Sequence, residues 1–243
     1  MDKKLDISQQ MATAPVWSLI IKLSIPAILA QVVNLLYNIV DRIYIGHMGD
    51  VGTMAITGVG LCFPIISLIS AFTMLIAQGG APRAAIEMGK GNIAKAEKIL
   101  GSCFSTLIVL SVMLTTVFLL FGEKFLMLFG ASESTIIYAL PYMNIYVAGS
   151  IFVMFSLGLN MFITTQGFTK ISMATVLIGA ICNIILDPIF IFGLNLGVKG
   201  AALATIISQA VSAVWVLSFL TGKKTKLRIR KENLLPDMKI LAP

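Results

Sequence analysis

Two aspartates, Asp41 and Asp187, lie within long apolar stretches of the sequence. A charged residue at the centre of a membrane-spanning helix costs roughly 2.5–3.5 kcal/mol on insertion scales, so such residues normally face a cavity or another helix. Carboxylate and amide oxygens bind protons and hard cations such as sodium. The two aspartates therefore predict a cation or solute pathway inside a membrane.

The first aspartate ends a polar stripe. On a helix with 3.6 residues per turn, Gln31, Asn34, Asn38 and Asp41 follow one another at steps of three or four and share one face. We therefore expect Asn34, Asn38 and Asp41 to bind a cation or a solute. Pro26, within the same apolar run, predicts a kink because proline removes a backbone donor.

The second aspartate belongs to a similar ridge. Thr175, Gly179, Asn183 and Asp187 recur every four residues, so Asn183 and Asp187 face the same way. Pro188 predicts a kink and frees a backbone carbonyl one turn earlier. An amide, a carboxylate and a free carbonyl would suit a proton, a sodium ion or a cationic solute. The alternative is a kinked helix whose polar residues only bond to neighbouring helices.

The elements that carry these residues are membrane helices. Of the 243 residues, 58% are hydrophobic and 12% are charged, whereas soluble domains carry about 25% charged residues. This composition predicts an all-α polytopic membrane protein with six transmembrane helices. The expected spans are Pro15–Ile45, a stretch within Val51–Pro82, Ile99–Gly122, a stretch within Ser134–Thr169, Ile171–Phe192 and Gly200–Gly222.

The basic residues orient these spans. With the N-terminus inside, fifteen of the eighteen Lys and Arg residues fall on the cytoplasmic side and three outside. We expect a multi-pass protein of the cell (inner or plasma) membrane with both termini cytoplasmic. Residues 1–14 would be a cytoplasmic segment, 15–222 a six-helix lobe and 223–243 a basic linker or tail. The basic clusters adjoin apolar spans, so we expect a lipid bilayer as partner and no nucleic acid.

Two further spans carry polar residues. In the fourth, Tyr142 and Asn160 are five turns apart, so they share a face if the helix is continuous. In the sixth, one face could equally line a cavity or pack closely against a helix. That face consists of Thr205, Ser208, Gln209 and Ser212.

Other chemistry is not expected. The three cysteines lie far apart, and the single histidine, His47, falls in a short loop. No nucleophile–base pair, metal cluster or phosphate-binding loop is present in the sequence, so we expect no enzyme activity and no cofactor.

Three stretches resemble the multidrug and toxic compound extrusion family of secondary transporters. They are LSIPAILAQVVNLLYNIVDRIYIGHMGD in the first span, Asn160 with TTQGFTK in the fourth, and ICNIILDPIFIFGLNLGVKGAALAT across the fifth and sixth. The resemblance covers nearly the whole chain from about Pro15 onward.

The resemblance implies two six-helix lobes around a central cavity, which export small organic cations in exchange for protons or sodium. The family's binding residues fall here on Asp41, Asn183, Asp187, Asn160 and Tyr142. It thus implies a coupling ion, H⁺ or Na⁺, and a sodium site at Asp41, Asn183 and Asp187.

Two features depart from the family pattern. Arg42 stands where a threonine is frequent, and we expect it to point outward from the cavity. The family has twelve spans, so we expect this chain to be an N-terminal half that lacks the second lobe and needs it, or a second copy, for transport. The alternatives are a flippase for lipid-linked saccharides of related architecture, and a non-transporting membrane fragment.

Overall fold

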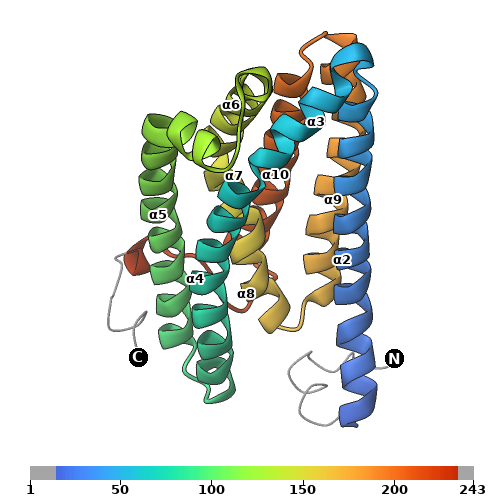
Figure 1. The fold of residues 1–243 in the computed structure, drawn as a ribbon. Helices are drawn as coiled ribbons and strands as arrows, with labels where there is room; N and C mark the ends of the chain where they lie inside the picture. Colours follow the sequence, from blue (N-terminus) through green and yellow to red (C-terminus); the bar gives the residue numbers. More distant parts are fainter. Residues whose placement is uncertain (1–14, 235–243) are drawn as a thin grey trace.

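A computed structural model describes residues 15–234, which form a bundle of long helices (Figure 1). The segment predicted to be cytoplasmic at residues 1–14, and residues 235–243 of the predicted linker, lie outside the described residues. The helix α2 begins at the same end of the bundle at which α10 ends, shown at the bottom of Figure 1. We call this end the base.

Long helices make up most of the bundle, as apolar segments require in a membrane, where every backbone polar group must be satisfied within the protein. The helices that run through the bundle are α2 (Val16–Gly46), α4 (Phe63–Gly89), α5 (Ile93–Leu128), α9 (Thr169–Pro188) and α10 (Val198–Thr221). The shorter helical elements are η1 (Gly49–Val51), α3 (Gly52–Leu61), α6 (Glu133–Ala148), α7 (Ser150–Met154), η2 (Phe155–Leu159), α8 (Asn160–Thr165), η3 (Ile189–Gly193) and η4 (Lys231–Asn233).

The predicted all-helical membrane fold is confirmed. Within residues 15–234, five helical stretches are long and apolar enough to cross a bilayer, and a sixth is added when one bent pair counts as a single span. That pair is the predicted fourth span, in which Glu133–Ala148 and Ser150–Thr165 meet at 59°. A second break follows at once, where Phe155–Leu159 is wound as a π-helix. The fourth span is therefore not the continuous helix on which the shared face of Tyr142 and Asn160 depended.

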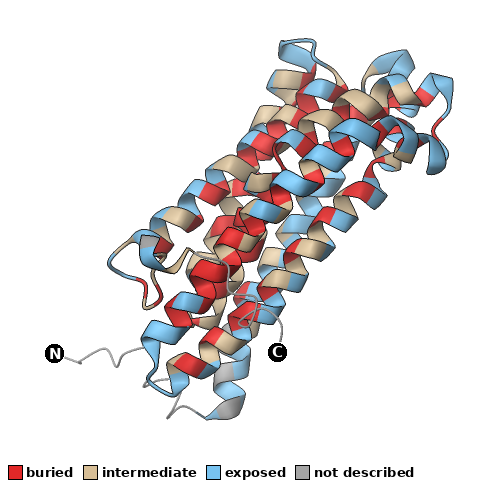
Figure 2. Cartoon of the chain, turned by 90° about the vertical axis from the view of Figure 1, so that its left-hand side faces the viewer, coloured by how far each residue is buried: buried red, intermediate tan, exposed pale blue. Residues whose placement is uncertain are grey.

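Burial follows the packing of the helices. Exposed side chains cover the outer faces, and buried ones concentrate where the helices meet (Figure 2). The helix α2 packs mainly along α9, and it leaves a row of large apolar residues, such as Ile28, Leu35 and Ile39, at its surface. Such a surface is typical of a helix that faces lipid or another apolar partner.

Small residues allow the helices to approach closely. At Gly58 of α3, a Cβ atom would lie 2.8 Å from the backbone oxygen of Thr135 on α6. At Gly60, two residues further along the same helix, a Cβ atom would meet nothing within 4 Å. Close backbone contact between membrane helices depends on such glycines, because apolar side chains gain little by leaving lipid for protein.

This pair of glycines gives a matched test of the α3–α6 contact. We expect Gly58→Ala to lower the free energy of unfolding by about 1–3 kcal/mol, because the added methyl group meets a backbone atom that cannot rotate away. Gly60→Ala should leave stability unchanged or raise it, since alanine is the better helix former by about 1 kcal/mol. Thermal unfolding in detergent measures both variants, and equal melting temperatures would contradict the assigned contact.

Candidate functional site: a cavity beside two buried carboxyl groups

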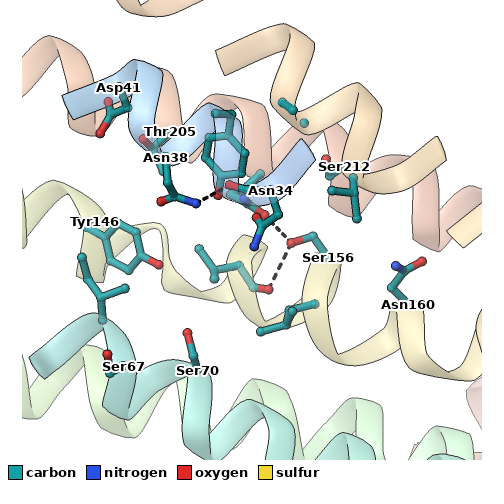
Figure 3. A pocket seen from close by; sticks show the side chains of 18 of the residues that line it. Asn34, Asn38, Asp41, Ser67, Ser70, Tyr146, Ser156, Asn160, Thr205 and Ser212 are labelled. Atoms are coloured by element: carbon teal, nitrogen blue, oxygen red, sulfur yellow. Dashed lines mark hydrogen bonds between the residues drawn. The ribbon is translucent and has the colours of Figure 1, made fainter. Parts of the chain in front are cut away.

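A cavity of about 530 Å³ opens between the helices. Its walls come from α2, α4, α9, α10 and the bent stretch from α6 to α8. Figure 3 shows Ser67 and Ser70 of α4 across the cavity from Asn34 and Asn38 of α2. The lining residues are Asn34, Tyr37, Asn38, Asp41, Phe63, Ile66, Ser67, Ser70, Ala71, Met74, Tyr142, Tyr146, Val153, Ser156, Leu157, Asn160, Thr175, Val176, Gly179, Ala180, Thr205, Gln209 and Ser212.

The polar stripe of α2 borders this cavity. Asn34, Asn38 and Asp41 all line it, whereas Gln31, at the start of the stripe, is exposed and does not belong to the lining. The Asn38 side chain donates a hydrogen bond to the backbone oxygen of Asn34 at 2.6 Å. The stripe thus presents amide groups and one carboxylate to the cavity.

The ridge of α9 divides between wall and interior. Thr175 and Gly179 line the cavity, but Asn183 and Asp187 lie outside the lining and are buried, with exposed fractions of 2% and 0%. Asp41, which is 9% exposed, lies near enough to Asp187 for the two carboxyl groups to interact electrostatically. The packing of α2 on α9 therefore brings the two aspartates together, and only Asp41 of the pair lines the cavity.

The carboxyl pair and its neighbour Asn183 include buried oxygens that accept no hydrogen bond. Asn183 Nδ2 donates to Asp187 Oδ1 at 3.2 Å and to Thr205 Oγ1 at 3.4 Å. Within residues 15–234, three buried oxygens of this cluster find no hydrogen-bond partner: Asp41 Oδ1, Asn183 Oδ1 and Asp187 Oδ2. A buried acceptor without a partner is costly, so such oxygens indicate a place for a ligand. Hard oxygens of this kind fit a proton or a sodium ion.

The fourth span contributes both of its predicted residues to the cavity despite its breaks. Tyr142 lies before the bend and Asn160 follows the π-helix. The Asn160 side chain accepts a hydrogen bond from Thr175 Oγ1 at 3.1 Å and donates one to the backbone oxygen of Ser172 at 3.2 Å. The ring of Tyr142 stacks on that of Tyr146. Asn160 thus ties α8 to α9 at the cavity wall.

The face of α10 belongs to the cavity. Thr205, Gln209 and Ser212 line it, so the question left open by the sequence is answered for these three, and the buried Ser208 is not part of the lining. The Gln209 side chain accepts a short hydrogen bond from Ser156, which lies in the π-helix η2.

Several lining residues escaped the sequence analysis. Tyr37, Ser67, Ser70 and Ser156 carry no charge and belong to no recognised polar stripe. For Tyr37 a signal existed, since its position three residues after Asn34 puts it beside the predicted stripe on the helix surface. The serines offered none, because isolated serines are ordinary in membrane helices.

The remaining predicted residues lie at or beyond the edges of the site. Pro26 is buried inside α2, which continues as one helix to Gly46, and the kink there stays a prediction. Pro188 ends α9 at the point where the chain becomes the π-helix η3, so the helix changes its winding two residues after Asp187. Arg42 is exposed and does not line the cavity, as its position one residue past Asp41 predicted.

These features define a class: a multi-pass helical membrane protein whose cavity adjoins a buried carboxyl pair, as in secondary transporters. The MatE family model matches residues 26–189, more than half of the chain, and the chain belongs to that family. The resemblance drawn from the motifs is thereby confirmed.

Comparison with curated proteins supports the same family. The chain is 28% identical over 213 residues to the "Multidrug export protein MepA" of Staphylococcus haemolyticus (strain JCSC1435), which covers 88% of this chain and 47% of that protein. The "Multidrug export protein MepA" of Staphylococcus saprophyticus is 26% identical, over 90% of this chain and 48% of that protein. The chain thus spans about half the length of the curated relatives it matches.

Solved structures give the same result. The structure described as "Crystal structure of MATE in complex with MaD3S" superposes with a TM-score of 0.88 at 26% identity, covering 99% of this chain and 53% of that one. "Crystal structure of MATE in the bent conformation" gives a TM-score of 0.84 at 28% identity, over 92% and 49%.

The carboxyl pair gives a stability prediction. We expect Asp187→Asn to raise the free energy of unfolding by about 1–3 kcal/mol in sodium-free buffer at high pH, where no shared proton relieves the pair, because an amide can donate to the Asp41 carboxylate where a second carboxylate repels it. Asp50→Asn, in the exposed turn after α2, serves as the control and should change nothing. Thermal unfolding checks both, and a destabilised Asp187→Asn variant would contradict the proximity of the two carboxyl groups.

Proposed function

We propose that this chain is the N-terminal lobe of a secondary antiporter that exports cationic, drug-like or toxic organic compounds in exchange for protons or sodium ions. One observation carries the proposal: among the described residues that line the cavity, Asp41 alone is charged. A single negative charge in a low-dielectric wall attracts cations and repels anions.

The rest of the lining fits an organic cation. The cavity volume of about 530 Å³ suits a drug-sized molecule. Three tyrosines, Tyr37, Tyr142 and Tyr146, and one phenylalanine, Phe63, offer aromatic surface. Aromatic faces attract a cation by roughly 0.5–2 kcal/mol, and they tolerate varied shapes because the attraction needs no fixed donor geometry. We therefore expect broad rather than narrow selectivity.

Exchange follows from the position of Asp41. Its carboxyl group faces both the cavity and Asp187, so it serves two cations that exclude each other. When a proton or sodium ion joins Asp41 to Asp187 and Asn183, the charge offered to the cavity is neutralised and the organic cation is released. When the ion leaves, Asp41 is again free to hold a solute.

We also propose where this lobe is located and what completes it. We propose a cell-membrane location with both termini in the cytoplasm, as the distribution of basic residues predicts. The relatives are about twice as long, so we propose that the cavity is completed by a second lobe, supplied by further chain or by a second copy.

The lipid-linked saccharide flippase is the less favoured alternative. Such a substrate carries phosphate groups, and its cavity should present Arg or Lys. Neither type occurs among the lining residues, and the nearby Arg42 lies outside the cavity. Binding of organic cations tests the cavity, whereas solute flux restored by a co-expressed second lobe separates the proposal from a non-transporting fragment.

The first functional prediction concerns Asp41. Tetraphenylphosphonium should bind the purified chain in lipid nanodiscs, and Asp41→Asn should weaken that binding about tenfold or more, because removing a charge at contact distance is worth at least about 1.4 kcal/mol. Titration calorimetry measures the affinity, and Asp50→Asn is the matched control. Undiminished binding by the Asp41→Asn variant would end the proposal.

The second prediction identifies the coupling ion. Adding sodium, or lowering the pH, should weaken tetraphenylphosphonium binding to the unaltered chain, since either ion neutralises Asp41. In the Asp187→Asn variant this competition should shrink, because one carboxyl group of the ion site is missing. The ion that competes is the coupling ion, and the shared-site mechanism fails if neither does.

A further inference from the structure

The chain that follows α10 is docked against the base of the bundle. We call residues 223–234 the strap. The side chain of Leu227 is fully buried in the hydrophobic core, and Ile229 packs against the same core. The sequence predicted only a basic linker or a solvated tail here, so this degree of burial is a finding of the structure.

Gln166 is the first anchor of the strap. This side chain is 2% exposed and lies at the end of α8. Its Oε1 atom accepts three hydrogen bonds from the strap, from Thr225 Oγ1 and the Lys226 backbone at 2.8 Å each and from the Leu227 backbone at 3.0 Å. Its Nε2 atom donates to the backbone oxygen of Phe162 at 2.9 Å. The side chain therefore holds the strap with one end and α8 with the other.

Glu97, near the start of α5, is the second anchor. Its side chain is 7% exposed, and it accepts the Arg228 backbone N–H at 3.2 Å and pairs with Arg230 at 2.8 Å. Further on, the strap lies directly on α5: a Cβ atom at Gly101 would stand 2.2 Å from the backbone oxygen of Asn233. The Ser105 hydroxyl donates to the backbone oxygen of Leu234.

The strap contacts three helices at the base. The Ile229 backbone donates to the oxygen of Leu220 in α10 at 3.1 Å, so the strap joins α10, α8 and α5. Gln166 also adjoins the turn into α9, in which Gly167 has a φ of +87°. Above that turn, Thr164 bonds to Ser172 at 2.8 Å and fastens α8 to α9.

We propose that the strap is a built-in clamp, in which Gln166 and Glu97 hold residues 223–234 against α5, α8 and α10 and thereby fix the α8–α9 turn. The clamp positions α9, the helix that carries Asn183 and Asp187. Gln166 is a positioning residue that does not belong to the lining of the cavity described above. The inference does not rest on the proposed transport function, because it concerns only how the base is held together.

Hydrogen exchange measured by mass spectrometry, on the full chain in lipid nanodiscs, tests the clamp. Four successive backbone N–H groups, at residues 226–229, are hydrogen-bonded and should exchange slowly. Gln166→Leu removes the triple acceptor and should speed their exchange about tenfold or more, the factor that a loss of about 1.4 kcal/mol produces. The backbone amides of residues 169–172, after the turn, should exchange faster as well.

Two further variants and two matched controls complete the test. Gln166→Glu retains an acceptor oxygen and should preserve slow exchange. Gly101→Ala removes no hydrogen bond and favours the helix, but its methyl group should push the strap away and open it to trypsin, which cleaves after Arg228. Gln78→Leu and Gly79→Ala, on exposed or open positions of α4, are the matched controls.

The exchange rates of these variants support or overturn the clamp. Slow exchange that is lost in Gln166→Leu and Gly101→Ala, and kept in Gln166→Glu and both controls, supports the clamp. Fast exchange of residues 226–229 in the unaltered chain would overturn it, as would unchanged exchange in both Gln166→Leu and Gly101→Ala. Equal loss in Gln166→Glu and Gln166→Leu would overturn the role of the acceptor oxygen. Unchanged exchange at residues 169–172 would overturn the fixing of the turn.

Discussion

Two carboxyl groups side by side in the interior of a membrane protein are the constraint on which the rest of this structure depends. Each is expensive to bury alone, and together they repel whenever both are charged. The contact between Asp41 and Asp187 exists because α2 packs along α9 over much of its length. The arrangement is tolerable only if a cation or a shared proton occupies the oxygens that lack partners.

The irregular winding of the helices serves the same arrangement. Regular helices satisfy all their backbone groups internally, so breaks in a membrane concentrate where polar side chains or ligands make up the loss. Here the π-helix η2 carries Ser156 into the cavity wall, and the π-helix η3 begins two residues after Asp187. Both departures from α-helical winding thus lie at the cavity or the carboxyl pair.

The helices are held together by different contacts at the base and along the cavity. At the base, hydrogen bonds and an ion pair fasten the strap to three helices. Along the cavity, contacts between helices are made by uncharged groups such as Asn160, Thr175 and Ser212. Such contacts are individually worth about 0.6 kcal/mol in a membrane, so they can exchange partners at little cost in free energy.

The sequence by itself determined the solvent, the helical class and the faces of single helices. Apolar run lengths predicted the spans, and steps of three and four residues placed Asn34, Asn38 and Asp41 on one face, because helical geometry alone sets those directions. The same spacing correctly put Asn183 and Asp187 on one side of α9. These results need only the local geometry of one helix.

Tertiary structure decided everything that involves two helices. Periodicity gives a direction but no distance, so only packing could place Asp187 beside Asp41, and only packing put Asn183 and Asp187 behind the cavity wall. The bend at Gly149 and the docking of the strap on Gln166 likewise escaped the sequence, because each depends on atoms far apart along the chain. Which helices touch is set by how their whole surfaces fit, and that information is absent from the pattern of any one segment.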